Sequence, residues 1–312
     1  MSGPGEGPRV LVVGGLGGLL GRALATELVA GHRVRSFHRH RLEEEARLGV
    51  EWVEGDVAGP TDWSGLLDGV DAVVNLAWYR WGSAARFRGL RTGLVGLLNE
   101  ARAHGIGRFI QVSVPGAPPA LESRLPYLRE KRAVDDAVAR SGISYRILRP
   151  TAMFGERDVL LGVMIRAIHR YPFFPMFGDG EYHLSPIAAA DVARAITREL
   201  ARDAVGTDDL GGPRCFTYRE LTDLMYALLG KRPRYWRMSP RNGHRLAAIL
   251  QTLGSSLLYA YEVDWLVADR LGLPPYSGLD RPLRSCEPYL RARADALRLP
   301  PAPRRSPPGR QG

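Results

Sequence analysis

The sequence predicts an α/β protein built on a doubly wound parallel sheet, followed by a smaller and mostly helical C-terminal domain. Two observations carry this prediction. Short apolar runs alternate with helix-forming stretches as far as Pro150, which is typical of consecutive βαβ units. After residue 155 the alternation ends, and the chain is expected to be mostly helical and rich in loops.

Each expected strand is a short apolar run bounded by turn residues, and each expected helix has apolar residues at helical spacing. The expected strands are Arg9–Val13, His32–Phe37, Val50–Val57, Val70–Ala77, Arg108–Ser113, Ser144–Pro150 and Leu184–Ile187. The expected helices are Gly21–Ala30, Trp63–Leu67, Ala84–His104, Pro126–Arg140, Ala190–Arg202 and the apolar but interrupted Leu246–Tyr261. The aromatic and proline-rich stretch Tyr171–Gly180 is expected to be a loop, either an apolar wall over a ligand or local packing.

The first βα unit contains a glycine-rich turn in which three glycines recur at every third position. In such a turn the first glycine permits the bend, the second lets the backbone approach a pyrophosphate, and the third brings the helix close to the strand. The helix N-terminus offers unpaired N–H groups and a positive dipole end to the anion. The turn predicts a dinucleotide site, with a plain glycine-rich turn as the alternative. The expected contact residues are Gly15, Leu16, Gly18, Leu19, Leu20 and Gly21.

The end of the second strand favours NADP(H) over NAD(H). Enzymes that prefer NAD place a carboxylate there, about 20 residues after the glycines, for the ribose 2′-hydroxyl. This chain has His38-Arg39-His40-Arg41 instead, with no acid before Glu43. An arginine suits a 2′-phosphate, so Arg39 is the first candidate and Arg35 the second. The alternative is a solvated loop in an arginine-rich protein.

Further cofactor contacts are expected at the carboxyl ends of other strands. Asp56 follows the third strand, where its carboxylate can accept a hydrogen bond from an adenine amino group or cap the next turn. The remaining expected contacts are Val57, Leu76, Ala77 and Pro150.

Tyr127 and Lys131 lie four residues apart on one face of an expected helix. A nearby ammonium favours the phenolate and lowers the pKa of the tyrosine, which makes the phenol a general acid/base for a carbonyl–alcohol pair. The same lysine can hold the cofactor ribose. The alternative is a pair of surface neighbours.

The composition excludes several classes of protein. No run approaches 18 apolar residues, so no transmembrane helix is expected. Cys215 and Cys286 fit neither a metal site nor a disulfide framework, which favours the cytoplasm and no bound metal. The net charge is +10, but only two of the 43 basic residues are lysines and the arginines are spread along the chain. That pattern indicates a composition bias and no nucleic-acid partner. A homo-oligomer is compatible with the sequence.

With these residues in place, the chain resembles the short-chain dehydrogenase/reductase superfamily, in its extended or atypical NAD(P)-dependent epimerase/dehydratase branch. It looks especially similar to the relatives of the nucleotide-binding accessory subunit of respiratory complex I. The resemblance covers roughly residues 9–230 and implies a Rossmann-like N-terminal domain. It rests on the glycine turn, Gly55-Asp56-Val57, Asn75-Leu76-Ala77, Tyr127 with Lys131, Leu148–Gly155, and Phe177–Ile187 followed by Asp191-Val192-Ala193.

The resemblance also implies a run of serines after the fifth strand, the last of which polarises the substrate oxygen. Only Ser113 is present here, and it could instead satisfy backbone groups. The leading hypothesis is an NADP(H)-dependent oxidoreductase with Tyr127, Lys131 and Ser113 as catalytic residues and a small-molecule substrate that the sequence does not identify. The alternatives are a nucleotide-binding assembly or sensor protein without significant turnover, and a nucleotide-sugar epimerase or dehydratase.

The expected domain organisation has four parts. Residues 1–8 form a flexible N-terminus without the features of a signal peptide. Residues 9–155 form the NAD(P)-binding domain, to which 184–202 return. Residues 156–299 form the substrate domain, and 300–312 a disordered basic, proline-rich tail.

Overall fold

The computed structural model describes residues 7–80, 82–252 and 260–299, and all structural statements refer to these residues. The expected tail, and the expected flexible N-terminus apart from Gly7 and Pro8, lie outside them.

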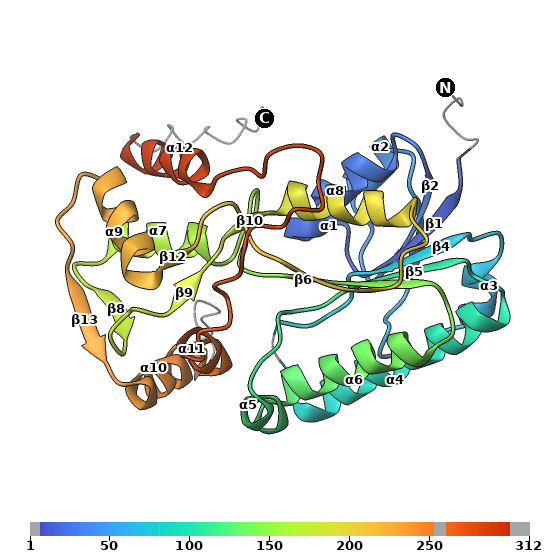
Figure 1. The fold of residues 1–312 in the computed structure, drawn as a ribbon, viewed down its shortest axis with the longest axis horizontal. Coiled ribbons are helices and arrows are strands. Elements are labelled where there is room, and N and C mark those ends of the chain that lie inside the picture. Colours follow the sequence, from blue (N-terminus) through green and yellow to red (C-terminus); the bar gives the residue numbers. More distant parts are fainter. Residues whose placement is uncertain (1–6, 81, 253–259, 300–312) are drawn as a thin grey trace, which may run out of the picture.

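A seven-stranded, wholly parallel sheet forms the centre of the N-terminal lobe (Figure 1). Its strand order is β11-β6-β5-β4-β1-β2-β3, so the order reverses between β1 and β4. Ligands of such sheets bind in the crevice at the carboxyl ends of the strands at this reversal. The strands are β1 Arg9–Val13, β2 Arg33–His38, β3 Glu51–Glu54, β4 Ala72–Asn75, β5 Arg108–Val112, β6 Tyr145–Pro150 and β11 Gly206–Leu210.

Helices cover both faces of the sheet, and each face has its own apolar core. The continuous burial of the inner strands, such as β4 with all four residues buried, explains why they read as apolar runs without alternation. One face carries α1 Leu19–Leu28 and α8 Ala189–Leu200, which pack on each other. The other carries α3 Trp63–Leu67, α4 Ala84–Ala103 and α6 Pro126–Arg140. The short helices are α2 Glu43–Arg47 and α5 Pro119–Arg124.

The C-terminal lobe is mostly helical, as expected. Its main core lies among α7 Leu161–Arg170, α9 Tyr218–Leu228 and α12 Cys286–Arg298. A smaller cluster joins Phe177, Met238 and Val263 beneath α10 Pro240–Thr252 and α11 Ala260–Val267. Three two-stranded ladders complete it, β7 Met153–Phe154 with β10 Ile187–Ala188, β9 His183–Leu184 with β12 Phe216–Thr217, and β8 Phe174–Phe177 with β13 Tyr235–Met238.

Several elements differ from the prediction. The strand expected over Leu184–Ile187 is split between β9 and β10. The stretch expected to be a loop contains β8, and Phe174 and Phe177 are buried in the cores of the C-terminal lobe. These rings pack locally and are not an apolar wall of the cavities described below. The helix expected over Leu246–Tyr261 is described only as the end of α10 and the start of α11, because 253–259 lie outside the described residues.

The two edge strands of the sheet both carry carboxylates. Glu51 and Glu54 lie at the ends of β3, and Asp208 and Asp209 lie in β11. Two of these carboxylates pair with arginines of the neighbouring strands, Glu51 with Arg35 of β2 and Asp208 with Arg146 of β6.

Candidate cofactor and active site

Two adjoining cavities open at the carboxyl ends of the strands. The main cavity, of about 650 Å³, lies between the two lobes and takes residues from the glycine turn, α6 and α11. A second cavity of about 210 Å³ lies beside the ends of β2 and β3. Gly15, Leu76, Trp78 and Tyr79 line both, so the two cavities form one continuous trough across the switch point.

Most of the residues that the sequence singles out lie in this trough. The main cavity contains Gly15, Gly18, Leu19, Leu20, Gly21, Leu76, Ser113, Tyr127 and Lys131. The second cavity contains Gly15, Arg39, Asp56, Val57, Leu76 and Ala77. Leu16 and Pro150 do not line either cavity. The side chain of Leu16 is in the core beneath α1, and the next residue after Pro150, Thr151, lines the main cavity instead.

The glycine turn uses its glycines in different ways. The bend requires Gly14, where φ is 98° and a Cβ would lie 2.6 Å from the amide nitrogen of Ala77, and not Gly15 as the spacing predicts. At Gly21 a Cβ would lie 2.3 Å from the carbonyl oxygen of Gly15, so this glycine brings α1 against the turn. At Gly18 a Cβ would make only an ordinary contact at 3.6 Å. The fold does not require glycine at this position, which opens on the main cavity.

Arg157 is a candidate phosphate ligand that the sequence reasoning missed. It lines the main cavity, and its Nη1 donates to the carbonyl oxygen of Gly17 at 3.4 Å. Its φ of 65° is unusual for a residue with a side chain, and such strain is often found at functional sites. In the sequence, only the turn Gly155-Glu156-Arg157 directly after a short strand pointed to this residue. The chain has many other turns that contain an arginine, so this pattern did not set Arg157 apart.

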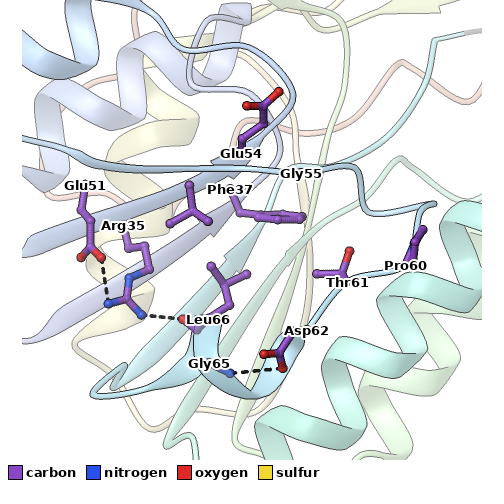
Figure 2. Close-up of a pocket in the computed structure, with 11 residues that line it drawn as sticks. Arg35, Phe37, Glu51, Glu54, Gly55, Pro60, Thr61, Asp62, Gly65 and Leu66 are labelled. Atoms are coloured by element: carbon purple, nitrogen blue, oxygen red, sulfur yellow. Dashed lines mark hydrogen bonds and ion pairs between the residues drawn. The ribbon is translucent and has the colours of Figure 1, made fainter.

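Arg39 and Arg35, the two candidates for a 2′-phosphate, lie in different places. The exposed Arg39 lines the second cavity, with its guanidinium carbon 5.8 Å from the centre of the Tyr79 ring. Arg35 lies in a separate pocket between β2, β3 and α3 (Figure 2), where it pairs with Glu51 at 2.9 Å and donates to the carbonyl oxygen of Leu66 at 2.6 Å. Because Arg35 is buried and has these partners, the structure removes it as a candidate.

Glu45, a carboxylate close to the end of β2, does not line the second cavity. Glu45 is buried and accepts hydrogen bonds from Ser36 at 2.9 Å and from the backbone of Leu42 at 3.0 Å, and its other close contact is His38 at 2.6 Å. Its carboxylate therefore caps α2 and ties this helix to β2. Among the described residues, the second cavity has Asp56 as its only carboxylate.

Asp56 has structural partners as well as a place in the second cavity. Its Oδ1 accepts from the amide of Ala58 at 3.0 Å, which is the turn cap that the sequence offered as an alternative. The same oxygen accepts from the hydroxyl of Tyr79 at 2.9 Å. Burial and this carboxylate raise the pKa of Tyr79. The guanidinium of Arg86 lies over the Tyr79 ring, with its carbon atom 3.9 Å from the ring centre.

Tyr127 lies in a cluster of aromatic rings at the wall of the main cavity. Trp78, Phe87 and Trp265 surround it, with ring centres 6.1, 5.7 and 6.1 Å away. Burial among these rings, reinforced by the negative charge of Glu262, raises the pKa of Tyr127. The sequence argument expected a lowered pKa. In this structure desolvation is the dominant effect, so the phenol is protonated at neutral pH.

Lys131 reaches the same cavity from the next turn of α6. Its Nζ donates to the carbonyl oxygen of Val112 at 3.2 Å and lies 4.5 Å from the centre of the Trp78 ring. Burial lowers the pKa of Lys131 to about 8, although Asp135 acts in the opposite direction. The indole of Trp78 thus contacts both Tyr127 and Lys131. Its buried Nε1 has no hydrogen-bond partner among the described residues.

Ser113 is tied to a carboxylate rather than to the backbone. Its hydroxyl donates to Oδ2 of the buried Asp135 at 2.7 Å. The same oxygen binds Arg132 at 2.7 Å and Arg149 at 3.3 Å. A Ser113 hydroxyl in this geometry can accept a hydrogen bond from a substrate, but it donates its proton to Asp135. The sequence did not identify Asp135, because a carboxylate four residues after Lys131 is unremarkable on an exposed helix.

The lobes are joined next to Tyr127. Arg80, which follows β4, forms a two-pronged ion pair with Glu262 of α11 at 2.9 and 3.2 Å. Arg124 of α5 pairs with Asp264 of the same helix at 3.0 Å. These two ion pairs hold α11 over the end of α6, so α11 and its Trp265 close the main cavity on the side of the C-terminal lobe.

Within the described ranges no group of His, Cys, Asp and Glu side chains is arranged to hold a metal ion. None of the helices in this part of the chain is long and apolar enough to cross a membrane.

Comparisons with known proteins agree with the glycine turn and the sheet order. A family model described as NAD(P)H-binding matches residues 15–203. Subunit 9 of the NADH dehydrogenase (ubiquinone) 1 alpha subcomplex from Arabidopsis thaliana, a mitochondrial protein, is 37% identical over 142 residues, or 44% of this chain and 35% of that protein. The 2-alkyl-3-oxoalkanoate reductase of Stenotrophomonas maltophilia is 29% identical over 195 residues, or 55% of this chain and 59% of that protein.

The chain therefore spans between a third and three fifths of the length of these two curated relatives. Among solved structures, the UDP-glucuronic acid 4-epimerase of Bacillus cereus in complex with NAD superimposes with a TM-score of 0.66 at 18% identity, over 93% of this chain and 98% of that one. This likeness concerns the fold. With the family model over residues 15–203, the parallel sheet and the trough at its switch point, the chain belongs to the NAD(P)H-binding family, and its fold is that of the epimerase structures.

Proposed function

We propose that the protein is an NADP(H)-dependent reductase that acts on a carbonyl group of a largely apolar substrate. The observation that carries the proposal is that Tyr127 and Lys131 line the same cavity as the glycine turn. The glycine turn and the Tyr127–Lys131 pair therefore both lie at the carboxyl ends of the strands, at the crevice where sheets of this kind bind a dinucleotide.

The residues of the trough fit a nicotinamide dinucleotide. The turn at Gly18 has room above the N-terminus of α1, and a pyrophosphate there would meet the helix N–H groups and Arg157. The second cavity would take the adenosine, with Asp56 near the base and Arg39 near a 2′-phosphate. An exposed arginine without a nearby carboxylate on the ribose side supports NADP(H) over NAD(H).

Tyr127 would act as the general acid of this reduction. The carbonyl carbon would receive a hydride from NADPH, which the trough would hold beside Tyr127 and Lys131. Tyr127 Oη would donate its proton to the carbonyl oxygen; the raised pKa keeps the phenol protonated at neutral pH but makes it a weaker acid, so the proton transfer relies on the charge that develops on the carbonyl oxygen. The Lys131 ammonium stabilises the phenolate that remains, and its lowered pKa limits this role to pH values below about 8. Ser113 orients the substrate or the phenol as an acceptor, because its proton is donated to Asp135.

The wall of the main cavity supports an apolar substrate. On the side of the C-terminal lobe it is formed mainly by Val159, Leu160, Trp265, Leu266 and Leu271, which offer hydrocarbon and one indole, while Arg157 and Glu262 are the charged residues of this side. The similar protein of Stenotrophomonas maltophilia is named for the reduction of a 3-oxoalkanoate with an alkyl branch. A ketone next to an alkyl chain is therefore the first substrate class to test.

The test is NADPH oxidation with a panel of 3-oxo acids, 3-oxo esters and simple ketones of increasing chain length. Turnover is expected to increase with chain length. Tyr127→Phe is expected to lose at least a hundredfold in kcat with little change in the Kd of NADPH. Tyr145→Phe, a half-buried tyrosine outside both cavities, is the matched control. Equal turnover by Tyr127→Phe and wild type would exclude the assigned role.

Arg39 is tested separately. Arg39→Gln is expected to weaken NADPH binding more than tenfold and to leave NADH binding unchanged. Arg41→Gln, which removes a neighbouring exposed charge that does not line the second cavity, controls for general electrostatics. Equal losses in both variants would argue against a 2′-phosphate contact at Arg39.

A nucleotide-binding role in a larger assembly is the second candidate. Two observations favour it: the proton of Ser113 is donated to Asp135, and 37% identity links part of the chain to a subunit of a plant NADH dehydrogenase. Tight NADPH binding without turnover on the whole panel, together with a stable protein partner, would support this role over the reductase. The cytoplasmic location and the homo-oligomer remain predictions.

A further inference from the structure

The surface of the C-terminal lobe at β8 and β13 combines exposed aromatic rings with unbalanced positive charge. Residues 159–178 and 224–261 contain no aspartate or glutamate, but they contain eight arginines and lysines. Six of the eight lie within residues 231–245. The positive charge of this region is therefore close to the net charge of the whole chain, +10.

The fold brings the two segments together. Strands β8 and β13 pair in parallel, and the amide of Phe174 donates to the carbonyl oxygen of Arg234 at 2.9 Å. The Lys231 ammonium donates to the carbonyl oxygen of Ile168 at 3.2 Å, which fixes the start of β13 to the end of α7. We call residues 170–175 with 231–237 the basic–aromatic surface. Figure 1 shows β8 and β13 at the end of the C-terminal lobe, away from the parallel sheet.

Three large side chains are exposed on this surface. Trp236 is 59% exposed, Phe173 56% and Tyr171 52%, and they are among the most exposed large apolar residues in the described structure. Trp236 lies opposite Pro175 in the ladder, so these two side chains point to the same face, and the exposed Phe173 directly precedes β8. Their neighbours Phe174 and Tyr235 point the other way, into the aromatic core with Tyr218 and Tyr226. The outward rings are therefore not required for packing.

The charges around these rings are not neutralised within the described chain. No arginine or lysine between 170 and 175 or between 231 and 245 forms an ion pair with a carboxylate among the described residues, although 20 arginine–carboxylate pairs are formed elsewhere; within the second segment only His244 lies near a carboxylate, 2.9 Å from Asp264. Arg170 contacts the ring of Tyr171, and Arg245 contacts the side chain of Asn242. Arg232, Arg234 and Arg237 are exposed and flank Trp236 in the sequence.

We propose that the basic–aromatic surface docks the protein on a lipid bilayer that contains anionic phospholipids. Arginines near such a bilayer gain from its negative surface potential, and tryptophan, tyrosine and phenylalanine insert at the level of the headgroups. A nucleic acid would also attract the arginines. Phe173, however, has no polar atom and lies between Pro172 and Pro175, and this hydrocarbon matches acyl chains better than phosphate and sugar. Docking brings the protein next to the phase in which apolar substrates dissolve.

Sedimentation of the full chain with vesicles tests the proposal. Binding to vesicles of phosphatidylcholine with 30% phosphatidylglycerol, a composition set by the experiment, is expected to be at least tenfold stronger than binding to pure phosphatidylcholine. Each arginine near an anionic bilayer contributes about a fivefold change in binding, so the triple variant Arg232→Gln, Arg234→Gln, Arg237→Gln is expected to bind on the order of 100-fold more weakly. The double variant Phe173→Ser, Trp236→Ser keeps the charge and is also expected to bind more weakly.

The control removes the same charge elsewhere. Arg88, Arg102 and Arg140 are exposed on α4 and α6, so their triple change to Gln has the same effect on net charge. If this control loses as much binding as the first triple variant, net charge and not the basic–aromatic surface attracts the vesicles, and the proposal is wrong. Equal binding to neutral and anionic vesicles would also overturn it. So would tighter binding to a single-stranded oligonucleotide that the first triple variant abolishes, because the surface would then fit a nucleic acid.

Discussion

In the glycine turn, alanine substitutions at two nearby glycines are expected to have different effects: one should reduce cofactor binding and the other should reduce stability. Gly18 and Gly21 both lie at the start of α1, and sequence spacing treats them as equivalent members of one motif. The structure separates them. A Cβ on Gly21 would lie 2.3 Å from the carbonyl oxygen of Gly15 and 2.6 Å from the Cα of Leu16, whereas a Cβ on Gly18 would lie 3.6 Å from its nearest neighbour.

Gly21→Ala is therefore expected to destabilise the fold. Both close atoms belong to the backbone, so the helix and the turn must move apart. Overpacking of this kind costs about 3 kcal/mol at the upper end of its usual range. In a chain of 312 residues that corresponds to a fall of about 5 °C in Tm.

Gly18→Ala is expected to leave the fold intact and to disrupt binding. Gly18 is the N-cap of α1, with φ at −75°, so alanine is sterically allowed. The weaker cap and the reduced freedom of the unfolded chain nearly cancel, and the free energy of unfolding changes by less than about 1 kcal/mol. The new methyl group projects toward the cavity, where it would compete with the cofactor. NADPH and NADH binding are both expected to weaken more than tenfold, or about 1.4 kcal/mol.

Thermal denaturation and fluorescence titration of both variants against wild type would measure the two effects. If Gly18→Ala binds NADPH as wild type does, the pyrophosphate does not pass over this residue and the assignment of the turn is wrong. If Gly21→Ala unfolds at the same temperature as wild type, the close packing of α1 on the turn has been overestimated.

Three further predictions concern charged residues of the site. Arg157→Gln is expected to weaken NADPH and NADH by the same factor, about 5–10-fold, because the pyrophosphate is common to both; a loss for NADPH alone would contradict this contact. Asp135→Asn is expected to cost about 3–5 kcal/mol in urea denaturation, because it leaves buried donors and charges unpaired, whereas the exposed neighbour Asp136→Asn should cost almost nothing. Lys131 has a pKa of about 8 in the folded chain, which is below its value in the unfolded chain. Between pH 8 and 10 the unfolded chain therefore binds more protons than the folded chain, so the free energy of unfolding increases as the pH rises through this window. Lys131→Met is therefore expected to be more stable than wild type at pH 7, by about 2–3 kcal/mol, and to lose this advantage by pH 10; an advantage that does not change with pH would show that the ammonium is not desolvated.

The parallel sheet was predictable because its inner strands are buried on both faces and therefore read as continuous apolar runs. Helices with strong patterns were located well, and α3 and α6 have the bounds that the sequence indicated. Strand β11 was missed because Gly206–Leu210 contains two aspartates and only one apolar residue, a composition with low strand propensity. Its pairing with β6, which is distant in the sequence, outweighs this low propensity. Strand β8 was missed because prolines usually end strands, but Phe174–Phe177 is paired on one side only, where Pro175 is tolerated.

The site shows a similar division. Local spacing was enough to place Tyr127 and Lys131 in one cavity with the glycines. The pKa of Tyr127 could not be predicted, because its sign depends on Trp265 and Glu262 of α11, more than 130 residues away in the chain. The partner of Ser113 was equally hidden. Asp135 is on the expected helix, but only the packing of α6 against β5 turns it inward.

The carboxylates on the edge strands have a consequence for how copies of this chain meet. Exposed edges of a sheet have unpaired backbone groups that can recruit a second sheet and lead to aggregation. Here both edges present acids, at Glu51 and Glu54 of β3 and at Asp208 and Asp209 of β11, although the protein as a whole is basic. Glu51 and Asp208 are paired with arginines of the neighbouring strands, but the exposed Glu54 and Asp209 have no ion-pair partner among the described residues. Two copies that approach edge to edge would bring these two kinds of carboxylate together, so the edges disfavour pairing with a second sheet, and we expect self-association to use helices or the C-terminal lobe.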